Sequence, residues 1–309
     1  MENNLKISII ITHFFDIDYL INCLDSVFKS DYPNFEVIVV FNGNRDNSYE
    51  IAKQKFPQII SILNKKNLGF SRANNQGIKI SNGEIIFLLN DDTIIHPQLI
   101  SILSKKLISS DEIGIVGPKI YFMSASGDQT NKIWFAGGKI DWEKQKSYHL
   151  GRDMNDEAHK DEEKEVDFIT GCALMIKKEV IDKIGLLDEG FFAFYEDADW
   201  SQKAKKAGYK IVYVSFGGVW HAKSATAGKI FFGEEKKKNI FWLISNYFYR
   251  DVMVAWRRYK NKIIFFNRYL SGKDKFIFLL KSFFLSTPFL IWTIFYKIPK
   301  SIFNLRFKK

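Results

Sequence analysis

An apolar segment that ends in acidic residues is the strongest chemical signal in this sequence. FLLNDDT, residues 87–93, carries Asn90, Asp91 and Asp92 directly after a strand-like run. Carboxylate oxygens at that position are suitable ligands for Mg²⁺ or Mn²⁺, which could bridge a diphosphate. A turn that also caps the helix expected near Pro97 would explain the same residues, and this motif alone does not decide between the two readings.

A second acidic pair follows a cluster of aromatic residues. In GLLDEGFFAFYEDADW, residues 185–200, Glu196 and Asp197 stand at the predicted start of a helix. Carboxylates stabilise helix N-termini whatever their function, so capping is one interpretation. An aromatic environment favours a general base instead, because burial raises the pKa of a carboxyl group.

A histidine ends the third motif, VSFGGVWH, residues 214–221. His221 follows a strand and a turn of small residues, and it could reach a metal or a diphosphate. A single histidine is more often structural, so this residue gains weight only from the other two motifs.

The elements that must position these residues alternate along the first half of the chain. Apolar runs at 6–12, 35–41, 59–63 and 84–89 are separated by helical patterns. Such an order predicts an α/β fold with a parallel sheet that is covered on both faces. Ligands bind beyond the carboxyl ends of such strands, so we expect the segments that follow the strands to line the site. No GxGxxG follows the first strand, which disfavours a dinucleotide-dependent oxidoreductase.

The rest of the chain changes character twice. Residues 121–165 predict an excursion with short strands beside a substrate cleft, before a buried strand at 168–176. Residues 236–309 contain 17 Lys and Arg against two acidic residues, a net charge of +15, whereas residues 1–235 carry −5. We therefore expect a domain over 1–235, with halves at 1–120 and 121–235, and a basic, aromatic, helical region over 236–309.

The C-terminal region predicts contact with an anionic membrane surface. Residues 276–296 are rich in aromatic and aliphatic side chains, but their longest uncharged stretch is 282–296. That stretch is shorter than the roughly 18 to 20 residues that cross a bilayer. Flanking lysines and arginines fit an interfacial anchor better. Packing of these helices on the domain or across a homodimer was the alternative. Nucleic-acid binding fits poorly, because the charge lies beside an apolar segment.

The ordered motifs resemble family 2 glycosyltransferases with the GT-A fold, over roughly residues 6–250. Within that family the resemblance is to the bacterial rhamnosyltransferase and galactofuranosyltransferase-like branch. It is carried by ISIIITHFFDIDYLINCLDSVFKSDYPNFEVIVVFNG, NLGFSRANNQGI, LLNDDT, the segment GCALMIKKEVIDKIGLLDEGFFAFYEDADWSQKAKKAGYKIVYV, and VWH. The resemblance implies a GT-A-type, Rossmann-like, mixed and mostly parallel sheet flanked by helices.

The resemblance also implies roles for individual residues. Asp92, with Asp91 and His221, would bind Mg²⁺ or Mn²⁺ on the donor diphosphate. Asp197 would be the catalytic base beside Glu196. Glu196 and Trp200 would shape the acceptor pocket, and the nucleotide would be contacted by Thr12, Asn42, Asn67 and Arg72, with Asp91 nearby.

Two positions depart from the family pattern. Phe41 stands where an Asp usually contacts the nucleoside, which leaves the choice between uridine and thymidine open. Asn90 takes the first position of the acidic motif and is a weaker metal ligand than Asp, so metal binding would rest on Asp92, Asp91 and His221.

The function expected from these observations is transfer of a sugar, with inversion, from a nucleotide-diphosphate donor of the dTDP-rhamnose or UDP-hexose type. The expected acceptor is a polyprenyl-diphosphate-linked cell-surface glycan, used at the cytoplasmic face of the membrane by a peripheral or monotopic enzyme. Two cysteines without a CxxC motif, and no signal peptide, fit a reducing compartment. A catalytically silent sugar- or lipid-binding module is the alternative.

Overall fold

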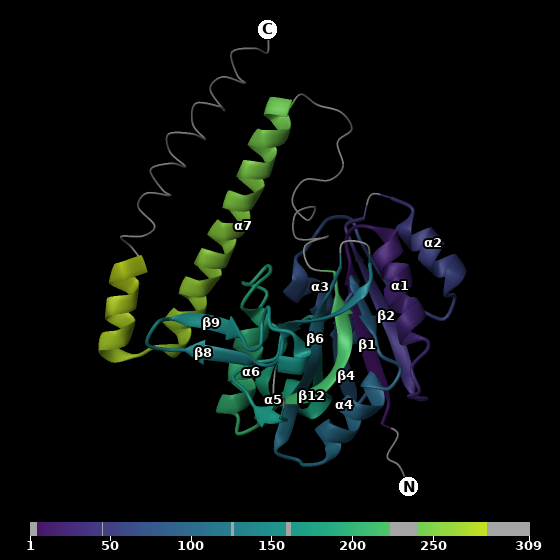
Figure 1. The fold of residues 1–309 in the computed structure, drawn as a ribbon, viewed down its shortest axis with the longest axis horizontal. Helices are drawn as coiled ribbons and strands as arrows, with labels where there is room; N and C mark the ends of the chain where they lie inside the picture. The colour runs from purple at the N-terminus through teal and green to yellow at the C-terminus, as the bar shows by residue number, and fades with distance from the viewer. Residues whose placement is uncertain (1–4, 45, 125–126, 159–161, 223–239, 283–309) are drawn as a thin grey trace.

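The computed structural model describes residues 5–44, 46–124, 127–158, 162–222 and 240–282, with only the helical course given for 240–252. Four parallel strands form its first half (Figure 1). They are β1 (Ile7–His13), β2 (Phe35–Asn42), β3 (Ile60–Asn64) and β4 (Ile85–Asn90), in the order β3-β2-β1-β4. The connecting helices are α1 (Ile17–Val27), α2 (Ser48–Lys55) and α3 (Phe70–Ile80). The parallel sheet predicted from the apolar runs is thus confirmed.

The crossover helices lie close against this sheet. β1 is buried along both faces, as its uninterrupted isoleucines predict. Gly77 of α3 allows the close approach, because a Cβ atom there would lie 2.5 Å from Ile10 Cγ2. Because β1 runs parallel to β2 and β4, the carboxyl ends of these strands lie at one shared edge of the sheet.

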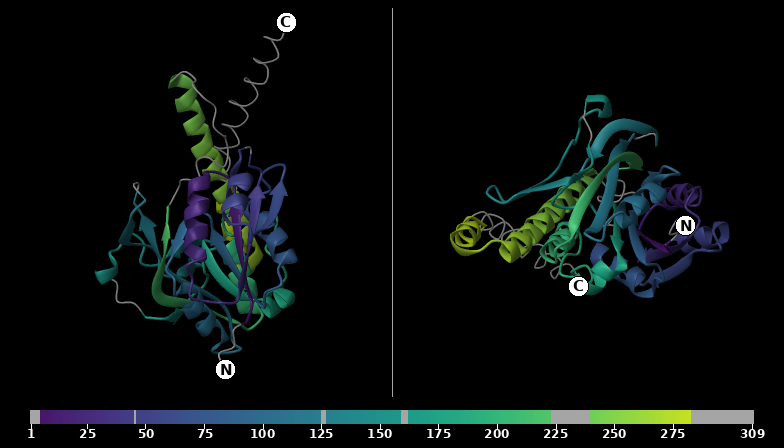
Figure 2. Two further views of the ribbon diagram at one scale, coloured as in Figure 1. Left: turned by 90° about the vertical axis from the view of Figure 1, so that its right-hand side faces the viewer. Right: turned by 90° about the horizontal axis from the view of Figure 1, so that it is seen from below.

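The second half extends the sheet in mixed orientation beyond β4. β11 is antiparallel to both β4 and β6, whereas β12 runs parallel to β6. The elements are β5 (Thr93–Ile95), α4 (Leu99–Ile108), β6 (Ile113–Met123), β11 (Ala173–Lys177), α5 (Lys178–Ile184), α6 (Glu196–Lys206) and β12 (Lys210–His221). The result is the predicted mixed α/β sheet with flanking helices (Figure 2).

Between β6 and β11 the chain makes the expected excursion of short elements. They are β7 (Gln129–Phe135), β8 (Gly138–Asp141), β9 (Lys146–His149), η1 (Asp156–Ala158) and β10 (Lys164–Glu165). β8 and β9 form a separate two-stranded sheet, a hairpin that stands beside the main one.

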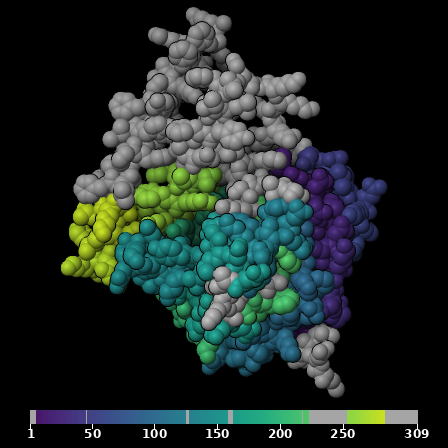
Figure 3. Space-filling view, in the orientation of Figure 1, coloured from purple at the N-terminus to yellow at the C-terminus, as the bar shows by residue number. Residues whose placement is uncertain are grey.

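The long helix α7 (Ile240–Tyr269) packs its C-terminal half against that hairpin and α6. Phe265 and Phe266 are fully buried, and the Phe265 ring stacks on Trp142 at 5.9 Å. The Arg268 guanidinium forms 2.6 Å ion pairs with Asp199 and Asp188. Helical residues 272–282 follow, beside α7 (Figure 3). The C-terminal half of α7 thus packs on the domain.

Other expectations for the C-terminal region fall outside the described residues. The boundary at 235 and 236 lies within 223–239, and most of the predicted anchor lies within 283–309. Among the helices that are described, none is both long and apolar enough to cross a bilayer.

Candidate active site

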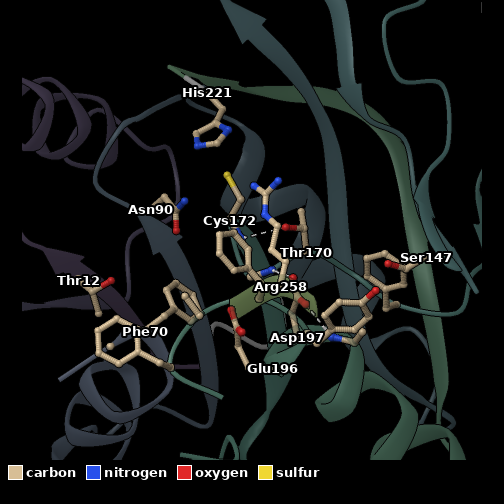
Figure 4. A pocket seen from close by; sticks show the side chains of 18 of the residues that line it. Thr12, Phe70, Asn90, Ser147, Thr170, Cys172, Glu196, Asp197, His221 and Arg258 are labelled. Carbon is tan, nitrogen blue, oxygen red and sulfur yellow. Dashed lines mark hydrogen bonds between the residues drawn. The ribbon is translucent and has the colours of Figure 1, made fainter. Parts of the chain in front are cut away.

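A cavity of about 940 Å³ opens at the edge of the sheet where β1, β2 and β4 end (Figure 4). Eight of the ten site residues predicted from the sequence line it: Thr12, Asn42, Asn67, Asp91, Asp92, Glu196, Asp197 and His221. The fold therefore brings together, in one cavity, residues that lie up to 209 positions apart in the sequence.

On the side of β2, the predicted nucleotide-contacting residues hold one another. The Asn42 amide donates to Asn67 Oδ1 at 3.1 Å and to the Gly69 carbonyl at 3.3 Å. Its own oxygen accepts from the Leu68 backbone at 3.0 Å. Asn42 thereby fixes the loop that leads into α3, and Thr12 lies beside it on the cavity wall.

Arg72 and Trp200 were predicted site residues, but neither is among the described residues that line the cavity. Arg72 forms a 2.7 Å ion pair with Glu189 and is half-exposed. Trp200 is fully buried and donates from Nε1 to the Gly185 carbonyl at 2.9 Å. The expectation that Trp200 shapes the acceptor pocket does not fit this position, because its ring packs in the core.

A histidine that the sequence analysis did not single out lies beneath the acidic motif. His13, fully buried at the end of β1, is hydrogen-bonded through Nδ1 to Asp91 Oδ2 at 2.6 Å. Burial raises the pKa of the Asp91 carboxyl, and the contact with His13 opposes that shift. Phe41, the departure from the family pattern, is itself buried and packs edge-on against the His13 ring. Asp91 is therefore committed to a partner inside the protein.

Asp92 pairs with His221 across two strands. Asp92 Oδ1 lies 3.1 Å from His221 Nε2, and both residues are nearly buried. Antiparallel pairing of β5 with β12 sets this approach, because it places His221 opposite Thr93. No third Asp, Glu, Cys or His joins them as a metal-binding group within the described part of the chain. A cation here would need further oxygen ligands from the substrate.

The Asp197 carboxylate stands at the start of α6, on the wall formed by residues 170–172. Its Oδ2 accepts from the Gly171 backbone at 2.9 Å, and its Oδ1 accepts from the Ala198 backbone at 2.8 Å. Burial raises the pKa of Asp197, although these backbone hydrogen bonds act against it. A raised pKa with a fixed orientation suits a general base.

Glu196 is buried beside it but is bonded differently. Its Oε2 atom has no hydrogen-bond partner among the described residues. Burial, and then the charge of Asp197, raise the pKa of Glu196 well above its ordinary value. The two neighbouring carboxyl groups therefore differ: backbone N–H groups fix the Asp197 carboxyl by hydrogen bonds, whereas Glu196 Oε2 is buried without one among the described residues.

The backbone that presents this pair is strained and supported by α7. Phe194 and Tyr195 have φ of 77° and 73°, in the left-handed region that such residues rarely adopt. The side-chain amide of Asn261 donates to the carbonyls of Ala193 and Phe194, at 2.8 and 3.0 Å. Helix α7 is thus part of the site and not only an appendage.

The family of the chain is shown by its sequence match. The model of glycosyl transferase family 2 matches residues 8–185, more than half of the sequence, and the chain therefore belongs to that family. The matched segment includes Asp91 and Asp92 and ends before Glu196 and His221.

Two relatives that are similar in sequence are also named as glycosyltransferases. The chain is 28% identical over 125 residues to the glycosyltransferase GlyG of Streptococcus pneumoniae, which covers 40% of this chain and 42% of that protein. It is 24% identical over 213 residues to AglE of Haloferax volcanii, which covers 67% and 64%. The chain thus spans less than two thirds of the length of either relative.

Among solved structures the fold is similar to GalNAc-T7 crystallised with UDP, GalNAc and Mn²⁺. The TM-score is 0.57 at 19% identity, over 72% of this chain and 44% of that one. Fold and family together place the chain among the family 2 glycosyltransferases, with a fold of the GT-A type.

Proposed function

We propose that this chain transfers a sugar from a nucleotide-diphosphate donor to a hydroxyl of a glycan acceptor, with inversion at the anomeric carbon. The observation that carries the proposal is that Asp197 and the Asp92–His221 pair face one cavity from different elements. A base on one wall and a site for diphosphate on the other are what a direct displacement requires.

In the proposed reaction Asp197 accepts the proton of the acceptor hydroxyl. That oxygen forms a bond to the anomeric carbon while the bond from this carbon to the diphosphate oxygen breaks on the opposite side. The Gly171 and Ala198 amides hold the Asp197 carboxylate in place as it takes the proton. Inversion follows because a single displacement occurs.

The residues present fit Mg²⁺ or Mn²⁺. Asp92 Oδ1 and His221 Nε2 lie 3.1 Å apart and offer an oxygen and a nitrogen ligand side by side. Diphosphate oxygens would supply the remaining ligands, and the cation would neutralise charge on the leaving group. Asp91, bonded to His13, would support the site and not bind the cation directly.

Thr12, Asn42 and Asn67 are proposed to border the nucleotide, consistent with their place beyond β1 and β2. A dTDP-rhamnose or UDP-hexose donor and a polyprenyl-diphosphate-linked acceptor remain our proposals from the sequence resemblance. Exposed Phe276, Leu279 and Leu280 support contact with a membrane surface. Flotation of the full chain with anionic vesicles, but not neutral ones, would test that contact.

The test of the function is a panel of nucleotide sugars with and without Mn²⁺. Release of nucleoside diphosphate from one donor, dependent on the metal, is expected. No turnover of any donor under any metal condition would contradict the proposal.

A further inference from the structure

The wall of the cavity opposite the nucleotide half is basic. Arg152 follows β9, and Arg258 and Lys262 lie one helical turn apart on α7; all three line the cavity. Residues four positions apart share a helix face, so Arg258 and Lys262 point to the same side. Figure 4 shows the Arg258 side chain extending into the cavity.

These three cationic side chains have few carboxylate groups nearby, within the described part of the chain, to balance their charge. Among the described residues, neither Arg258 nor Lys262 forms an ion pair with a carboxylate, and Arg152 has only its neighbour Asp153 at 3.6 Å. The Arg258 side chain is exposed at the cavity. Its pKa is nevertheless lowered, first by partial burial and then by the positive charge of Arg152. The pKa of Lys262 is lowered in the same way, by partial burial and then by the charge of Lys146. Like charges held together without a counter-charge favour an anionic ligand.

The position of the basic wall assigns that ligand to the acceptor. Arg258 and Lys262 come from α7, and Arg258 lies over the Phe194 ring at 4.4 Å, beside Tyr195. Those aromatic residues lead directly into Glu196 and Asp197. The proposed nucleotide residues, by contrast, end β1 and β2 or follow β3. Arg152, after β9, lies over the Phe122 ring at 5.9 Å, and because Phe122 pairs with His221, this arginine borders the proposed donor side as well.

We infer that Arg152, Arg258 and Lys262 form a subsite for an oxyanion, a phosphate or a carboxylate, carried by the acceptor next to the hydroxyl that Asp197 activates. The inference rests on the proposed function and adds the charge class of the acceptor. Arg258 and Arg152 can each bind an oxyanion in a two-pronged manner, and Lys262 adds a third positive charge.

The test uses three alkyl acceptors built on the same sugar: a neutral glycoside, its diphosphate-linked form and its uronic acid. KM and kcat are measured with the donor that the panel identifies, for the wild type, Arg258→Gln and Lys262→Gln. Lys260→Gln is the matched control, because Lys260 is exposed on α7 and does not line the cavity. Donor hydrolysis without acceptor is measured for each protein.

One anionic acceptor should have a lower KM than the neutral one, and each cavity variant should raise that KM roughly tenfold or more. The KM of the neutral acceptor, and donor hydrolysis, should stay unchanged in the variants. The diphosphate and uronic acid arms identify which oxyanion is used.

Equal use of neutral and anionic acceptors by the wild type would overturn the inference while leaving the proposed function intact. Loss of donor hydrolysis in Arg258→Gln, in a variant whose thermal unfolding is unchanged, would assign this cation to the donor diphosphate and would also overturn it. A wild type that consumes no donor would instead contradict the proposed function.

Discussion

The two sides of the cavity differ in how many of their polar and charged side chains have partners within the protein. On the proposed donor side the polar residues contact one another: His13 bonds Asp91, Asn42 bonds Asn67, and Asp92 lies against His221. Of these residues, only the outer ring nitrogens, His13 Nε2 and His221 Nδ1, are buried without partners among the described residues. On the acceptor side, Glu196 has a partnerless oxygen, and Arg258 and Lys262 lack carboxylate partners within the part of the chain that the structure describes.

The comparison teaches where the substrate has to complete the site. A network of contacts within the protein holds its shape before anything binds. Charges without compensation gain stability only when a ligand of opposite charge arrives. We therefore expect changes on the donor side to affect every reaction, and changes on the acceptor side to depend on the acceptor used.

The largest effect is expected from Asp197→Asn, which removes the proposed base. Transfer to the acceptor should fall by about 10²- to 10⁴-fold, the usual contribution of general base catalysis, while donor binding persists. Steady-state kinetics with calorimetric donor titration would measure this.

Asp182→Asn, on the exposed face of α5, makes the same chemical change away from the cavity and should have no effect. An Asp197→Asn enzyme that keeps wild-type kcat would remove Asp197 from the reaction.

The next effect is expected from Asp92→Asn on the donor side. Loss of one carboxylate ligand should lower donor turnover on the order of 10²-fold, because a bound cation stabilises developing charge by several kcal/mol. The Mn²⁺ concentration needed for half-maximal turnover should rise as well. A variant with an unchanged Mn²⁺ titration would show that Asp92 does not bind the metal.

A smaller effect is expected from Asn261→Ala on α7. Two carbonyl acceptors at a strained turn would lose their donor, which should destabilise the fold by about 1–3 kcal/mol. Chemical denaturation would measure the loss, and transfer should weaken together with it.

Asn267→Ala, on the same helix and without such hydrogen bonds in the described structure, is the control. Equal stability of the two variants would mean that α7 does not support the Phe194–Tyr195 turn.

The smallest effect concerns pH and Glu196. Its pKa is raised in the folded state, so the folded chain binds the proton more tightly than the unfolded chain does. This contribution to stability is fully present below the unfolded pKa and is lost as the pH rises through the folded one.

The free energy of unfolding should therefore fall more steeply with rising pH, from about 4.5 upwards, in the wild type than in Glu196→Gln. Denaturation curves at several pH values would measure the difference. Parallel pH profiles would show that Glu196 is not protonated more readily in the fold.

The sequence predicts the parts of the site that depend on local patterns, and it misses the parts that depend on contacts between distant residues. Asp91, Asp92, Asn42 and Thr12 end strands with uninterrupted apolar runs, so the edge that they share was predictable. His13 was missed because its partner Asp91 lies 78 residues away and a single histidine has no pattern.

The basic wall was missed for a related reason. Arg258 and Lys262 belong to a region whose charge predicts contact with a membrane. Packing of Phe265 on Trp142, with the Asn261 hydrogen bonds and the Arg268 ion pairs, instead turns their face of α7 to the cavity. Trp200 was assigned to the acceptor pocket by the family resemblance, but its indole donates to the Gly185 carbonyl in the core. The spacing of residues along a helix predicts which side chains share one face, but it does not predict which other element packs against that face.

The central claim, a single displacement with Asp197 as base, is tested most directly by the anomeric configuration of the product. With the donor found in the panel and an alkyl glycoside acceptor, proton NMR of the new linkage should show the anomer opposite to that of the donor. A product that retains the donor's configuration would contradict the account.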